Sequence, residues 1–168
     1  ICVKRMLADN REFLLENFIP ASLRPAYETL TADLLAAVSS AYQPAPEDEI
    51  RIHGDCHVGN ILWRDDVAHF VDLDDARTGP AIQDLWMLLS GERPQQTQAL
   101  SAILEGYEQL RPFDRRELAL IEPLRTLRMI HYSAWLARRW QDPIFPVNFA
   151  PISIGTRSPS PDNPIVRE

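Results

Sequence analysis

The sequence predicts an α+β fold that is mainly helical and contains a small β hairpin. Two patterns support this prediction. Apolar residues recur every three or four positions on both sides of residues 50–72, which is typical of helices, whereas short apolar runs separated by polar turns fill residues 50–72 itself. With 168 residues, of which 45% are hydrophobic, the chain is long enough to bury one sizeable core.

The segment from Ser22 to Ala41 predicts a long amphipathic helix. Helical spacing links Leu23, Ala26, Tyr27, Leu30, Leu34, Ala37, Val38 and Ala41. Pro25 is compatible with this helix because a first turn does not need its backbone N–H. The helix is expected to stop at residues 43–46, where two prolines occur, and the acidic residues 47–49 favour a solvated turn.

Three short strands are predicted in the middle of the chain, at residues 50–53, 61–63 and 67–72, with residues 64–66 as the turn between the last two. The loop that joins the first two strands is rich in polar residues. The chemistry of the protein is therefore expected to lie on this small β region.

The C-terminal half is predicted to be helical at residues 81–90, 95–110 and 114–140. The buried stripe of the second of these helices is expected to contain Ala99, Leu100, Ile103, Leu104 and Tyr107. Asp114 and Glu117 have the spacing of a capping box, and Pro123 is expected to kink the last helix. We expect residues 1–149 to form one lobe and the proline- and serine-rich residues 150–168 to be a disordered tail.

Composition excludes several classes of protein. The formal charge of −7, from 24 acidic and 17 basic residues, argues against a protein whose main partner is nucleic acid. No apolar run approaches the roughly 18 residues of a membrane span. Cys2 and Cys56 give no disulfide framework, which favours free thiols in the cytoplasm. A monomer is expected.

The loop at residues 53–60, with the sequence HGDCHVGN, places a carboxylate and an amide five residues apart. Phosphoryl transfer uses such a pair, since the carboxylate of Asp55 can accept the proton of an attacking hydroxyl and the amide oxygen of Asn60 can help to hold Mg²⁺. Asp72, at the end of the third predicted strand, would add a second hard oxygen ligand. The spacing therefore predicts a phosphotransferase site that contains a metal ion.

HGDCHVGN, followed by FVDLDDARTGPAIQDLW, resembles the signature of the aminoglycoside phosphotransferase-like kinases. The resemblance covers about residues 20–149 and implies the helical C-terminal lobe of a protein-kinase-like fold. It also implies that Asp55 and Asp72 are catalytic, that Asn60 and Asp72 bind Mg²⁺, and that Asp84 braces the catalytic loop. ATP would be the phosphoryl donor.

Within that family, the longer runs RIHGDCHVGNILW and IEPLRTLRMIHYSAWLARRWQDPIFPVNF are similar to bacterial serine/threonine protein kinases of stress responses. This implies an acceptor Ser or Thr on a protein. The resemblance also implies that the ATP-anchoring N-terminal lobe would precede Ile1. On that basis the chain is expected to be an incomplete, inactive fragment without an ATP-anchoring residue of its own.

Other interpretations of the same residues stay open. A small-molecule phosphotransferase that acts on an aminoglycoside or choline-like acceptor would use the same loop, because fold does not dictate substrate. A remnant without catalytic activity is the alternative from another class. Cys56 with His57 is a weak zinc or thiol-nucleophile pattern, since no further ligands follow at a suitable spacing. Asp74 and Asp75 are left outside the predicted site.

Overall fold

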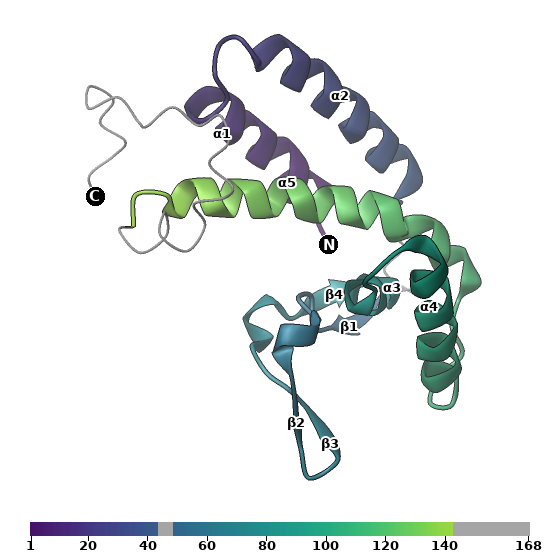
Figure 1. Cartoon of the computed structure of the whole chain (residues 1–168). Coiled ribbons are helices and arrows are strands. Elements are labelled where there is room, and N and C mark those ends of the chain that lie inside the picture. Colours follow the sequence, from purple (N-terminus) through teal and green to yellow (C-terminus); the bar gives the residue numbers. More distant parts are fainter. Residues whose placement is uncertain (44–48, 143–168) are drawn as a thin grey trace. The chain divides into compact units, whose positions relative to one another are not determined.

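The computed structural model describes residues 1–43 and 49–142, and it confirms a mostly helical chain with small antiparallel sheets (Figure 1). The predicted stop at residues 43–46, the turn at residues 47–49 and the tail at residues 150–168 lie largely or wholly outside these ranges. The α-helices and β-strands are α1 (Asp9–Asn17), α2 (Arg24–Ala41), β1 (Ile50–Ile52), β2 (Ile61–Arg64), β3 (Val67–Phe70), β4 (Arg77–Gly79), α3 (Ile82–Leu85), α4 (Arg93–Glu108) and α5 (Ile121–Arg139). The other helical segments are the π-helical η1 (Lys4–Ala8) and the 3-10 helices η2 (Val58–Asn60), η3 (Leu73–Asp75), η4 (Trp86–Leu88) and η5 (Arg115–Leu120).

The chain divides into two compact units. Of the described residues, the first unit comprises Ile1 and residues 38–43 and 49–125, and the second comprises residues 2–37 and 126–142. The division falls within α2 and within α5, so each of these helices contributes to both units. The single lobe predicted for residues 1–149 stays a prediction. Among the described residues, no helix combines the length and the apolar character that a membrane crossing needs.

Polar side chains fix the second unit internally. Asn10 is buried, and its Nδ2 donates to the carbonyl of Met6 at 2.9 Å, while Nη1 of Arg138 on α5 donates to its Oδ1 at 2.8 Å. Arg11 donates from Nε to Oγ1 of Thr31 on α2 at 2.6 Å. These side chains therefore tie α1 to both neighbouring helices of the unit.

The helix predicted at residues 22–41 is confirmed, but its predicted buried stripe is partly wrong. Leu23 and Leu30 are 55% and 58% exposed, whereas Thr31 is 2% exposed. The hydroxyl of Thr31 donates to the carbonyl of Tyr27 at 2.6 Å and accepts from Arg11, so its burial leaves no polar group unsatisfied. Periodicity did not identify the buried face because a polar residue with local partners took a core position.

The first unit contains two antiparallel pairs of strands. β2 pairs with β3 in the register Ile61↔Phe70, and the two residues between them, Asp65 and Asp66, both have positive φ, as a type I′ hairpin turn requires. β1 pairs with β4 in the register Ile50↔Gly79. The sequence did not predict β4. The loop at residues 53–60, where the site is predicted, connects β1 of one sheet to β2 of the other.

The helices of the first unit begin with caps that the sequence predicted in part. The side chain of Asp114 accepts the backbone N–H of Arg116 at 2.9 Å, as a cap of η5, but the Glu117 carboxylate accepts the N–H of Ile82 instead of closing a capping box. Pro123 is the third residue of α5, where a first turn tolerates it, so it opens the helix and does not kink its interior. Glu92 and Gln95 form a complete capping box at α4 that the sequence analysis missed.

Candidate active site

The predicted catalytic loop, residues 53–60, is braced from α3. The carboxylate of Asp84, on α3, accepts the backbone N–H of His53 at 2.7 Å through Oδ2 and that of Gly54 at 2.9 Å through Oδ1. Hydrogen bonds to an ionised acceptor are the stronger kind, and two of them on adjacent amides fix the backbone direction. The expected bracing by Asp84 is therefore present, and it sets the position from which Asp55 projects.

The ring of His53 connects the loop to the segment that follows β3. Its Nδ1 accepts the N–H of Asp55 at 3.3 Å, and its Nε2 lies 2.9 Å from the carbonyl oxygen of Val71. A backbone N–H can only donate, so Nδ1 carries no proton and Nε2–H donates to Val71. His53 thus acts as a neutral connector between the residues that precede Asp72 and the backbone of Asp55.

Asn60 is buried at the end of the loop and holds it closed. Its Nδ2 donates to the carbonyl of Asp55 at 2.9 Å, and its own carbonyl accepts the N–H of Val71 at 3.0 Å. Because the NH₂ group is committed to a carbonyl, the amide oxygen is the atom left to act as an acceptor or metal ligand. Asp55, Asn60 and the residue before Asp72 are therefore linked by direct hydrogen bonds.

Asp72 does not end a strand as predicted. β3 stops at Phe70, and Asp72 is exposed in the left-handed region with φ 62° and ψ 63°, directly before η3. Aspartate is among the few residues other than glycine that adopt this conformation readily. The turn projects a carboxylate from the segment that His53 and Asn60 hold. Nearby, Asp75 forms an ion pair with Arg77, so it has a structural partner.

The thiol of Cys56 is a poor nucleophile in this loop. Burial, followed by the negative charges of Asp84 and Asp55, raises the pKa of Cys56 to about 11. The thiol is therefore protonated at neutral pH, whereas nucleophilic attack and zinc binding both need the thiolate. Among the described residues, no group of three or more His, Cys, Asp or Glu side chains is arranged to hold a metal. The weak zinc interpretation gains no support.

Gly54 is a part of the site that the sequence analysis did not single out. It has φ +85°, and a Cβ built there would collide with the carbonyl oxygen of Asp75 and lie 3.1 Å from Nε of Arg77. The only signal in the sequence is a glycine directly before Asp55. The turn therefore needs glycine both for its backbone conformation and because the backbone of Asp75 approaches it closely.

We expect Gly54→Ala to lower the free energy of unfolding by about 2 kcal/mol or more, because an L residue is strained at this φ and its methyl group meets backbone. Urea unfolding of the chain measures the change. Gly106→Ala is the matched control. A Cβ at Gly106, within α4, meets nothing within 4 Å, so this substitution is expected to stabilise the chain by about 0.5–1 kcal/mol. Equal effects would contradict the close approach at Gly54.

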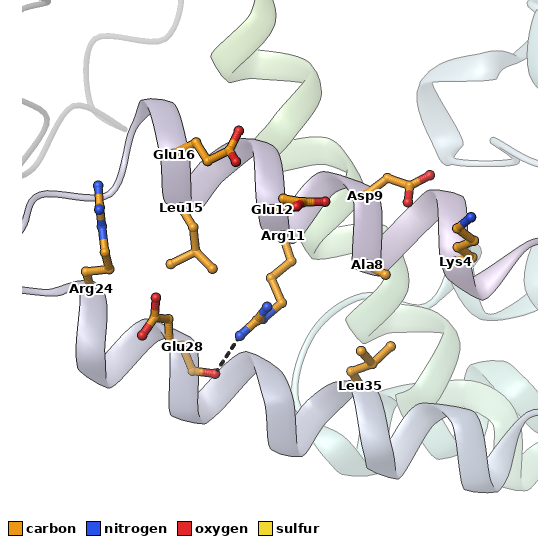
Figure 2. A pocket seen from close by; sticks show the side chains of 10 residues that line it. All are labelled: Lys4, Ala8, Asp9, Arg11, Glu12, Leu15, Glu16, Arg24, Glu28 and Leu35. Carbon is orange, nitrogen blue, oxygen red and sulfur yellow. Dashed lines mark hydrogen bonds between the residues drawn. The ribbon is translucent and has the colours of Figure 1, made fainter.

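The second unit contains a separate pocket, lined by residues of α1, α2 and η1 (Figure 2). Its volume is about 530 Å³, and its wall mixes acidic and basic side chains, including Glu12, Glu28 and Arg11. Nη2 of Arg11 donates to the carbonyl of Glu28 at 3.1 Å across it. None of the predicted site residues lines this pocket, so it adds nothing to the catalytic loop.

Comparison with known proteins gives a consistent set of relatives. A sequence model of the phosphotransferase enzyme family (APH) matches residues 5–121. Proteins named stress response kinase A from Escherichia coli O157:H7 and strain K12 are 55% and 54% identical to this chain over 133 residues. Serine/threonine protein kinase RdoA of Salmonella typhimurium is 53% identical over 131 residues. Each alignment covers 78% of this chain and 39% of the relative, so the chain spans about two fifths of the length of these proteins.

Proposed function

The chain belongs to the phosphotransferase enzyme family, and from that premise we propose that it supplies the catalytic loop of a serine/threonine protein kinase. ATP would be the phosphoryl donor, and Mg²⁺ would be required. The observation that carries the proposal is the hydrogen bond from Asn60 to the backbone carbonyl of Asp55, which holds the backbone that bears the Asp55 carboxylate next to the Asn60 amide. The names of the relatives support a protein acceptor and a role in stress responses.

Asp55 is proposed as the general base. Its carboxylate would orient the acceptor hydroxyl and accept its proton as the oxygen bonds to the γ-phosphorus and the bond from phosphorus to ADP breaks. Asp84 and His53 fix the backbone that carries the Asp55 side chain, so the carboxylate needs little reorganisation before the reaction. Phosphoryl transfer depends mainly on such positioning and on charge stabilisation.

Asn60 and Asp72 are proposed as the protein ligands of Mg²⁺. The donor set fits, because an amide oxygen and a carboxylate are hard oxygen ligands, and Mg²⁺ usually takes one or two carboxylates and completes its shell with water and phosphate. The commitment of the Asn60 NH₂ group to Asp55 presents the amide oxygen to the ion. When bound, the ion would neutralise charge on the phosphates. We also propose that the protein is a cytoplasmic monomer that binds neither nucleic acid nor membranes.

The acceptor class is tested in a chimera of Escherichia coli K12 stress response kinase A in which the matched segment of this chain replaces the corresponding segment of the relative. We expect labelled phosphate from ATP to appear on Ser and Thr of a generic protein acceptor at a rate comparable with that of the unmodified relative. Aminoglycosides, choline and sugar alcohols form the comparison panel. Preferential labelling of one of these small molecules would contradict the protein-kinase proposal and leave the phosphotransferase family unaffected.

A further inference from the structure

His57 lies two residues after Asp55 and has defined neighbours at both ring nitrogens. Its Nδ1 accepts the backbone N–H of Gly59 at 3.0 Å, and its Nε2 lies 3.8 Å from Oδ2 of Asp55. Because the Gly59 N–H can only donate, Nδ1 is unprotonated, and the neutral ring carries its proton on Nε2. The protonated ring nitrogen is therefore the one that lies near the Asp55 carboxylate.

Gly59 provides the space for this ring. A Cβ built at Gly59 would lie 2.8 Å from Cε1 and 2.9 Å from Nδ1 of His57, closer than real contacts allow. Gly59 is not among the residues with positive φ, so its backbone conformation is open to other residues. The requirement for glycine here comes from the imidazole and not from the turn. The ring thus has one nitrogen that accepts the Gly59 N–H and one nitrogen that lies near Asp55.

From this geometry we propose that His57 is a positioning residue for Asp55, an inference that rests on the proposed role of Asp55 as general base. The Nε2–H holds the carboxylate in one orientation by electrostatic attraction, so that the acceptor hydroxyl meets it at a fixed angle. The distance of 3.8 Å exceeds that of a hydrogen bond, so the effect is one of orientation and field.

A purely structural role is the alternative, since His57 is also the N-cap of η2, which presents Asn60. Stability alone does not separate the two roles. The side chain of His57 is 45% exposed, and an electrostatic attraction at such an exposed site contributes little to folding. A positioning role should therefore appear in turnover, whereas a capping role should appear in stability.

His57→Asn separates these roles, because Asn caps helices well but is too short to place a donor beside Asp55. In the chimera we expect kcat to fall about tenfold while KM for ATP changes less than about twofold. Thermal unfolding of the chain should be unchanged. His69→Asn is the matched control, since His69 is exposed on β3, and it should leave kcat, KM and unfolding as they are.

The double variant with Asp55→Asn identifies the route of the effect. If His57 acts through Asp55, His57→Asn should cause no further loss of turnover in the Asp55→Asn background. Normal turnover of His57→Asn would overturn the proposed role of His57. The same would follow if His57→Asn lowered turnover as much in the Asp55→Asn background as in the starting protein. Neither result would affect the proposed role of Asp55. Full turnover of Asp55→Asn itself would instead overturn the proposed role of Asp55.

Gly59→Ala tests the placement of the ring without any measurement of activity. The added methyl group forces the imidazole to move, so the ring should lose the hydrogen bond that it accepts from the N–H of residue 59, and the urea midpoint of unfolding of the chain should fall. In the His57→Ala background, where the ring is absent, Gly59→Ala should have no such effect. A loss that persists in that background would place the ring elsewhere and overturn the proposal.

Discussion

Asp55→Asn is expected to lower the turnover of the chimera by roughly 10²-fold or more, because a positioned general base contributes about that factor and an amide cannot accept the proton. Asn preserves the size of the side chain. The contact that closes the loop uses the backbone carbonyl of residue 55, which the substitution leaves in place. Steady-state labelling with ATP and a protein acceptor measures kcat, and KM for ATP is expected to stay the same.

The control for Asp55→Asn is Asp65→Asn at the tip of the β2–β3 hairpin. The Asp65 side chain is 89% exposed, and its weak ion pair with Arg64 has no part in the catalytic loop. Turnover of this variant should equal that of the starting protein. If Asp55→Asn also kept near-normal turnover, Asp55 would not be the base, whatever the stability of the variant.

Asp72→Asn is expected to raise the Mg²⁺ concentration needed for half-maximal turnover roughly tenfold or more, because it removes the negative charge from a proposed metal ligand. Asn is chosen because, like Asp, it tolerates the left-handed backbone at this position. The variant should therefore unfold at the same urea concentration as the starting chain. Magnesium titrations at fixed ATP measure the effect on turnover.

Asp66→Asn is the matched control for Asp72→Asn. Both aspartates are exposed residues with almost the same φ, 60° and 62°, so the two substitutions remove the same charge from the same kind of backbone. Asp66 lies in the hairpin turn, outside the loop. An equal Mg²⁺ requirement in the two variants would contradict the choice of Asp72 as a ligand.

The sequence predicted the strands that contain short apolar runs. The ends of β2 and β3 were predicted to within two residues, because short apolar runs flank the polar residues 64–66 that were predicted as the turn. β4 was missed because Arg77, Thr78 and Gly79 show no apolar pattern. This strand forms because β1 needs a partner for its backbone groups, and such pairing between distant segments leaves no trace in local sequence.

For the site, residue types and spacing indicated Asp55, Asn60 and Asp72, whose catalytic and metal-binding roles stay predictions, and the family resemblance implied Asp84 as a brace of the loop. Spacing could not predict the left-handed conformation of Asp72 or the surroundings of Gly54, because both depend on how segments distant in the sequence meet. His57 was judged only as a weak metal ligand next to Cys56. Its contact with Gly59 could be found only in three dimensions.

The backbone at Asp72 also restricts the routes by which evolution can inactivate such a site. A random change to Ala, Val or Leu there would strain the turn as well as remove the carboxylate, whereas Asn or Gly would remove only the carboxylate. On the proposed role of Asp72, descendants that lose phosphotransferase activity but are retained as folded proteins should therefore carry Asn or Gly at this position. The identity of the replacement would then distinguish a pseudoenzyme kept for its fold from a gene that is decaying.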